Sequence, residues 1–284
     1  MSPLFDFTDY GALVSLVSSS LIAGALLGVV GGLVGVFVMA RDLPFAVHGI
    51  SELSFAGAAG ALLVGADVVT GSIVGSLIAA LLIGLLGSRA RERNSVIGVL
   101  MPFGLGLGIL FLALYPGRSA NRFGLLTGQV VSVDTPQVVA LSAVALVVLA
   151  ALLLVWRPLL FASVDEDVAT ARGVPVRTLS LVFMVLLALT VSIAVQTVGA
   201  LLVLALLVTP AAAALRVASD PLVVSLLSMA FAVVSIVGGI LLALGAAIPI
   251  SPYVTTISFA IYLVCRGIGH RRRRIRTADV GSRP

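Results

Sequence analysis

Charged residues and cysteines are scarce in this sequence. Only 10% of its 284 residues are charged, whereas a soluble domain has roughly a quarter. Because 60% of the residues are hydrophobic and the mean hydropathy is +1.24, the sequence excludes a water-soluble globule and indicates a protein that lies in a bilayer. The single cysteine, Cys265, excludes a disulfide framework and a thiolate metal site within one chain.

Lysine is absent, and all 17 basic residues are arginines. A phosphate-binding loop of the GxxxxGK[ST] type needs its lysine to reach the β- and γ-phosphates, so this chain does not bind and split ATP by that route. The N-terminal segment holds Asp6 and Asp9 but no basic residue. A secretory signal peptide starts with positive charge, and we therefore expect the first apolar run to remain as a membrane helix.

Long apolar runs separated by short polar segments make up most of the chain. A helical crossing needs about 20 apolar residues, so this length allows roughly eight or nine crossings. We expect an all-α, polytopic transmembrane helical bundle in residues 1–270, followed by a basic cytoplasmic tail in 271–284. The expected helices lie at about 12–39, 47–66, 68–87, 96–115, 136–156, 178–195, 197–215, 222–244 and 250–266.

Arginines mark alternate ends of these helices and predict their orientation. Loops rich in arginine stay in the cytoplasm, which places the N-terminus outside and the C-terminus inside. The inside arginines are Arg41, Arg89, Arg91, Arg93, Arg157, Arg172, Arg177, Arg216, Arg266 and those between 271 and 276. Only Arg118 and Arg122 fall outside. A short re-entrant piece at 123–131 is an alternative to a simple outside loop.

His48 and Glu52 are the clearest ionisable residues at membrane depth. A spacing of four places both side chains on one helical face, one turn apart. An imidazole and a carboxylate form a common ligand pair for zinc, manganese or iron, and a buried carboxylate needs a cation, a proton or water. The alternative is structural, with the two side chains bonding each other or a neighbouring helix. Ser51 and Ser54 could add oxygen ligands, although serines in membrane helices mostly bond the backbone.

The segment SVDEDVATARGVPV, residues 163–176, lies in the only sizeable polar interruption on the inside. We expect Ser163 to cap a short helix whose first turn holds three acids, which suits the helix dipole. Gly173 then closes this helix, and Pro175 follows it. A short helix between two membrane crossings would act as a lever, and the alternative is an ordinary connecting loop.

Four stretches of the sequence resemble the zinc- and manganese-uptake family of ABC transporter permeases. They are SELSFAGAAGALLVG in the second expected helix, FGLLTGQVVSVD after the fourth, SVDEDVATARGVPV in the polar segment, and QTVGALLVLALLVTPAAAALRVASDP near the seventh. Together they span most of the chain from about Arg41 onward. The last two stretches in combination are fairly specific, whereas each alone is a weak signal.

The resemblance implies a multi-pass subunit of the bacterial inner membrane that imports a divalent transition metal, zinc or manganese or else iron. Two permease chains would pair as a homodimer, cytoplasmic ABC ATPase subunits would drive them, and an extracytoplasmic metal-binding protein would deliver the metal. The metal is then a transported substrate, and no cofactor is bound permanently. We also expect contact with membrane lipid and none with nucleic acid. The segment matching the coupling helix, which docks into the ATPase, contains Val164, Asp165, Glu166, Asp167, Ala169, Gly173 and Val174.

The resemblance also bears on His48 and Glu52. The matching family positions usually hold Asp and His and line the metal path in the dimer, whereas here the order is reversed and the acid is a glutamate. Both ligand types are kept, and we expect this pair to bind the metal. Two other functions stay open: a permease for a metal chelate such as a siderophore or haem, and an ion-coupled secondary transporter with Glu52 as its proton site. An enzyme is not expected, because no Ser/His/Asp set, Cys/His set or HExxH motif is present.

Overall fold

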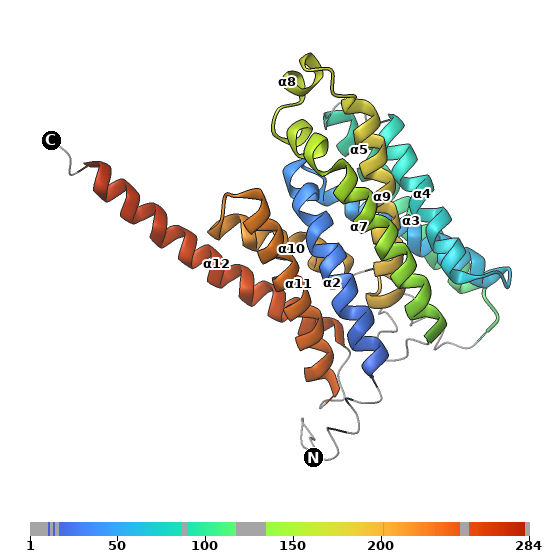
Figure 1. Cartoon of the computed structure of the whole chain (residues 1–284). Helices are drawn as coiled ribbons and strands as arrows, with labels where there is room; N and C mark the ends of the chain where they lie inside the picture. The colour runs from blue at the N-terminus through green and yellow to red at the C-terminus, as the bar shows by residue number, and fades with distance from the viewer. Residues whose placement is uncertain are drawn as a thin grey trace.

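The computed structural model describes residues 17–86, 90–117, 135–200, 202–244 and 250–281, together with residues 11 and 14. Within these residues the chain forms helices and no strand (Figure 1), so the predicted all-α bundle is confirmed. The helices are α2 (Ser18–Ala40), α3 (Pro44–Leu63), α4 (Val68–Leu86), α5 (Ala90–Leu114), α7 (Thr135–Val164), α8 (Glu166–Ala171), α9 (Val176–Val198), α10 (Val203–Val217), α11 (Pro221–Leu244) and α12 (Ile250–Gly281). The predicted re-entrant piece at 123–131, the FGLLTGQVVSVD stretch, Arg118 and Arg122 lie outside the described residues.

Most of these helices have the length and composition of membrane spans. In the described part of the chain, seven helices are long and apolar enough to cross a bilayer, namely α2, α3, α4, α5, α7, α9 and α11. A shorter apolar helix, α10, adds 15 residues. The number of helices is therefore roughly as the apolar runs predict, and the chain is a multi-pass membrane protein.

Several helices are longer than their apolar runs, which corrects the predicted boundaries. α5 begins at Ala90 instead of about 96, α7 continues to Val164 instead of about 156, and α12 continues to Gly281 instead of about 266. Two of the added segments are rich in arginine, which is a good helix former. The hydrogen-bonded helix therefore continues into polar sequence after the hydrophobic run has ended, and the apolar pattern marks only the edge of that run.

The helices pack in two groups that α7 and α9 connect. In the first group α3 packs between α4 and α5, and α9 packs against α4. In the second group α11 packs against α2, and α10 contacts α2, α11 and α12 (Figure 1). Within this arrangement α3 is enclosed by neighbours over most of its length, because its buried residues include polar as well as apolar side chains. The fold thus buries Glu52 and leaves His48 half-buried.

Small residues allow the closest helix contacts, as expected for packing in lipid. Along α2, a Cβ at Gly28 would lie 2.9 Å from the backbone of Val233, and one at Gly32 would lie 2.7 Å from that of Met229. The Ser228 hydroxyl donates a hydrogen bond of 2.7 Å to the Gly32 carbonyl across the same contact. The glycines at four-residue spacing on α2 therefore form the seam with α11.

The short helix α8 lies at the end of the bundle where α3, α5 and α9 begin (Figure 1). Its N-cap is Asp165, whose carboxylate accepts a hydrogen bond of 2.9 Å from the Val168 amide. The predicted short helix thus exists, but Ser163 does not cap it. Ser163 still belongs to the last turn of α7, and its hydroxyl donates to the Leu159 carbonyl at 2.6 Å. Gly173 ends the segment with a φ of +81°, a conformation that favours glycine.

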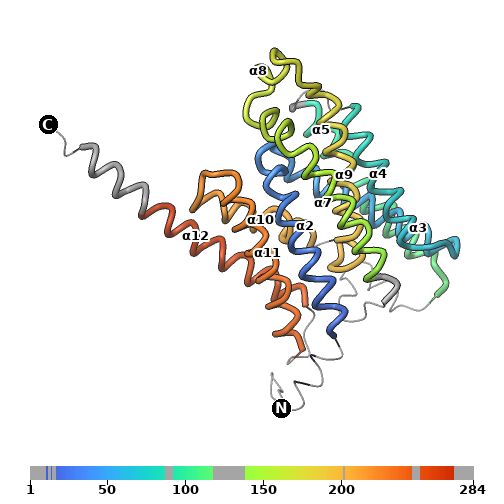
Figure 2. The backbone as a smooth tube through the Cα atoms, viewed as in Figure 1, coloured from blue at the N-terminus to red at the C-terminus, as the bar shows by residue number. Residues whose placement is uncertain are grey.

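The last helix, α12, leaves the bundle. Its principal contacts are with α10 and α11, and Figure 2 shows its described portion leaning away from the other helices. The Arg216 guanidinium donates to the Tyr262 hydroxyl at 3.3 Å and ties α12 to the end of α10. The basic segment predicted as a separate tail begins as a continuation of this helix.

Candidate functional site

The predicted ligand pair lies on α3. His48 Nε2 is 3.7 Å from Glu52 Oε1, so the two side chains face each other across one helical turn. This distance is too long for a good hydrogen bond. The His48 side chain is 32% exposed and that of Glu52 is 4% exposed. The imidazole is therefore accessible, while the carboxylate lies beneath it in the protein.

Glu52 is the unusual member of the pair. Its Oε2 atom is completely buried and accepts no hydrogen bond from any described residue. The backbone of Glu52 packs closely against α5, because a Cβ at Gly104 would lie 3.0 Å from the carbonyl carbon of Glu52. A buried carboxylate that lacks partners is unfavourable unless a cation or a proton joins it.

The neighbouring serines are used for packing. The Ser51 hydroxyl donates to the His48 carbonyl at 2.8 Å. Ser54 lies 2.7 Å from the Ser72 hydroxyl and donates to the Ser72 carbonyl at 3.1 Å, which joins α3 to α4. Both hydroxyls are thus engaged by protein groups. Among the described residues no group of three or more His, Cys, Asp or Glu side chains is placed to hold a metal ion.

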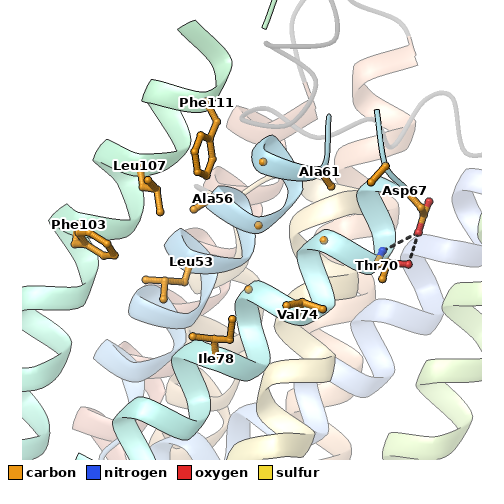
Figure 3. Close-up of a pocket in the computed structure, with 15 residues that line it drawn as sticks. Leu53, Ala56, Ala61, Asp67, Thr70, Val74, Ile78, Phe103, Leu107 and Phe111 are labelled. Atoms are coloured by element: carbon orange, nitrogen blue, oxygen red, sulfur yellow. Dashed lines mark hydrogen bonds between the residues drawn. The ribbon is translucent and has the colours of Figure 1, made fainter. Parts of the chain in front are cut away.

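A second face of α3 borders an apolar groove of about 540 Å³ between α3, α4 and α5 (Figure 3). Leu53, Phe103 and Phe111 are among its lining residues, and neither His48 nor Glu52 is. Asp67 lies at one end and accepts hydrogen bonds of 2.7 Å from the amide and the hydroxyl of Thr70. These bonds lower the pKa of Asp67. Its carboxylate thus caps the start of α4.

A polar cavity of about 650 Å³ lies at the arginine-rich end of the bundle, beside α8. It is lined by charged and hydroxyl side chains from five elements or their loops: Arg41, Asp42, Arg93, Ser163, Glu166, Arg177 and Ser180. In the sequence these arginines predicted only which helix ends face the cytoplasm. Their shared cavity could not be found from the sequence, because it depends on which distant helix ends meet.

The predicted coupling residues form an exposed projection next to this cavity. Val164 is 79% exposed, and Asp165, Glu166, Asp167 and Gly173 are exposed as well. Ala169 is fully buried and turns toward the bundle, and Val174 is half-buried.

Comparison with known proteins gives consistent results. The model of the ABC 3 transport family matches residues 14–267. The manganese transport system membrane protein MntC of Halalkalibacterium halodurans is 32% identical over 84% of this chain and 82% of its own length. The high-affinity zinc uptake system membrane protein ZnuB of Haemophilus influenzae is 25% identical over 78% of this chain and 86% of its own length.

A solved structure has the same fold. The structure described as PsaBC from Streptococcus pneumoniae in complex with Fab superposes with a TM-score of 0.82 and 26% identity, covering 92% of this chain and 95% of that one. The resemblance to zinc- and manganese-uptake permeases is thus confirmed by sequence and by fold. This chain, a multi-pass membrane protein, belongs to the ABC 3 transport family.

Proposed function

We propose that this chain is the permease subunit of an importer for a divalent transition metal, manganese or zinc, and that His48 and Glu52 bind the metal in transit. The observation that carries this proposal is the buried Glu52 carboxylate with a free Oε2 atom beside an accessible imidazole. The names of the relatives, a manganese system membrane protein and a zinc uptake membrane protein, support a metal of this class.

The proposed site is completed by a second copy of the chain. Zinc takes four ligands and manganese takes more, whereas α3 of one chain offers one nitrogen and one carboxylate. Two copies facing each other would bring two His48–Glu52 pairs together as a mixed nitrogen and oxygen set. Without thiolates, such a set binds firmly enough to load and weakly enough to release, which transport requires.

The energy for transport comes from a partner. We assign the arginine-rich end of the bundle to the cytoplasm by the positive-inside rule, so α8 and the exposed Val164 face an ABC ATPase there. ATP binding and hydrolysis on that partner would displace α8 and switch the metal pair between the two sides of the membrane. On the opposite side an extracytoplasmic binding protein would deliver the ion. The metal is substrate in this scheme.

Metal uptake in cells tests the proposal. The chain is expressed with its ATPase and its binding protein, and accumulation of manganese and zinc is compared between wild type, Glu52→Ala and His48→Ala. We expect both variants to lose uptake by about tenfold or more, since removing a ligand costs at least the ~1.4 kcal/mol that this factor represents.

Ser54→Ala is the matched control, because it removes a buried polar group of the same helix without removing a proposed ligand. It should leave uptake unchanged. Membrane levels of every variant are measured by immunoblot. Wild-type uptake by Glu52→Ala at a normal membrane level would remove the pair from the metal path. Loss of siderophore or haem uptake instead of metal uptake would favour the chelate permease.

A further inference from the structure

Arg41 occupies the tight turn that leads into the helix of the metal pair. It follows α2 directly, and α3 begins at Pro44. Backbone hydrogen bonds hold the turn: the Arg41 amide donates to the Phe37 carbonyl at 3.0 Å, and the Leu43 amide donates to the Val38 carbonyl at 2.9 Å. Asp42 between them has a φ of +52°, which few residues other than glycine adopt. A force applied to Arg41 therefore reaches the start of α3 through a short, fixed connection.

The Arg41 side chain bridges two helix ends that are distant in sequence. Its Nη1 donates to the Ser163 hydroxyl at 3.4 Å, and its Nη2 donates to the Ser180 hydroxyl. Ser163 lies in the last turn of α7 and Ser180 in the first turns of α9. α8 is the only helix between these two serines along the chain. One guanidinium thus holds both ends of the segment that carries the coupling helix.

An aromatic cluster packs next to the Arg41 bridge. The Phe37 ring packs edge-on against Trp156 with centroids 5.0 Å apart, and its centroid lies 6.0 Å from that of Phe183. The Arg41 guanidinium carbon lies 5.9 Å from the Phe183 ring centroid, within the range of a cation–π contact. α2, α7 and α9 are thus fixed to one another at this level, and Arg41 extends beyond them toward α8.

The charge of Arg41 interacts with the charge of Glu166 on α8. Burial lowers the pKa of Arg41, Glu166 of α8 raises it, and Arg93 lowers it. Glu166 and Arg41 both line the cavity of about 650 Å³, which leaves space for the guanidinium and the helix to shift relative to each other. An arginine stays charged, so its attraction to Glu166 and its two hydroxyl acceptors persists through such a shift. Arg41 is therefore linked to the coupling segment by two hydrogen bonds and by charge attraction.

We propose that Arg41 is a positioning residue that connects the coupling segment to α3, so that displacement of α8 by the ATPase is passed to His48 and Glu52. This inference rests on the proposed function and adds the route between the two sites. Ser163 and Ser180 are its acceptors on the coupling segment. Without the link, α8 would still dock and the ATPase would still turn over, but α3 would follow that motion less closely.

The ratio of ATP hydrolysed to metal transported tests the link. The chain is reconstituted in liposomes with its ATPase and binding protein, and hydrolysis and manganese or zinc entry are measured together. We expect Arg41→Gln to raise the ratio at least about fivefold, the lower end of typical coupling between sites. Arg41→Lys, which keeps the charge but loses the two-pronged geometry, should give an intermediate ratio.

Two further variants separate a link from a structural role. Arg177→Gln removes an arginine that lines the same cavity but is exposed, and it should leave the ratio unchanged. The double variant Ser163→Ala with Ser180→Ala keeps Arg41 and removes both acceptors, and it should raise the ratio as Arg41→Gln does.

A wild-type ratio in Arg41→Gln and in the double serine variant would overturn the link. A proportional fall of hydrolysis and transport would also overturn it, because a merely structural residue produces that pattern. Glu52→Ala is measured in parallel. If Glu52→Ala transports normally, the proposed metal site fails; if Glu52→Ala is inactive while Arg41→Gln keeps the wild-type ratio, only the link fails.

Discussion

Two charged side chains, Glu52 in the middle of α3 and Arg41 at the arginine-rich end of the bundle, have very different surroundings. Glu52 has one distant partner, His48, and a buried carboxylate oxygen that receives no hydrogen bond from any described residue. Arg41 has two hydroxyl acceptors, an aromatic face and the nearby charge of Glu166. A charge without partners is ready to receive a ligand, whereas a charge shared among several helices holds those helices together. The comparison separates the residues that would bind substrate from those that would transmit motion.

The largest expected effect is on the free energy of unfolding, which should change in opposite directions when Glu52 and Arg41 are replaced. Replacing Glu52 by Leu removes an unsatisfied buried group and should raise the free energy of unfolding of the metal-free protein by about 1–3 kcal/mol. Replacing Arg41 by Leu leaves two hydroxyls without their donor and should lower it by a similar amount. Thermal unfolding in detergent, followed on both purified variants without added metal, measures the two shifts. Destabilisation by Glu52→Leu would show that its carboxylate is satisfied.

The second prediction concerns metal uptake after His48 and Glu52 are exchanged on α3. His48→Glu and Glu52→His as single variants each leave two like ligands on one face, and metal uptake should fall by about tenfold or more, the equivalent of 1.4 kcal/mol. The double variant restores one imidazole and one carboxylate and should recover most of that loss. Uptake by the three variants at matched membrane levels is the measurement. A double variant as inactive as the singles would mean that the positions are not interchangeable.

The sequence predicted α3 and the placement of His48 and Glu52 on one of its faces, because an acid and a histidine four residues apart stand out in an apolar run. It also predicted α8, because three acids precede a glycine and a proline. It misplaced the ends of α5, α7 and α12, since polar residues can continue a helix after the apolar run stops. It assigned the cap of α8 to Ser163, because that serine stands before the acids, whereas Asp165 caps the helix.

The Arg41 bridge could not be predicted from sequence. Ser163 and Ser180 lie 122 and 139 residues away along the chain, and only the packed helices bring them to one guanidinium. The unpartnered oxygen of Glu52 has the same origin, because only the packing of neighbouring helices decides whether a donor reaches it. Local patterns therefore identify residue types and spacing, while the distribution of partners is a property of the packed bundle.

The smallest expected effect is on thermal stability at Asp67, an exposed carboxylate that accepts hydrogen bonds from Thr70. Thr70 holds the pKa of Asp67 below its usual value, so this bond stabilises the fold above the unfolded pKa of about 3.9. That contribution is lost as the pH falls through the lower pKa of the folded state. Asp67→Asn should therefore unfold at a slightly lower temperature than wild type near pH 6, and the difference should shrink toward pH ~3. A difference that grows with acidification would contradict the assigned hydrogen bonds.

Metal binding by the purified complex shows whether His48 and Glu52 form a site shared by two chains. Equilibrium dialysis of manganese and of zinc against the permease assembled with its ATPase gives the number of ions bound per permease chain, for wild type and for Glu52→Gln. If two His48–Glu52 pairs form one site, wild type should bind one ion for every two chains, and Glu52→Gln, which keeps the shape and removes the charge, should bind none at the same concentration. Unchanged binding by Glu52→Gln, or one ion for each chain, would contradict a transport site shared between two copies of α3.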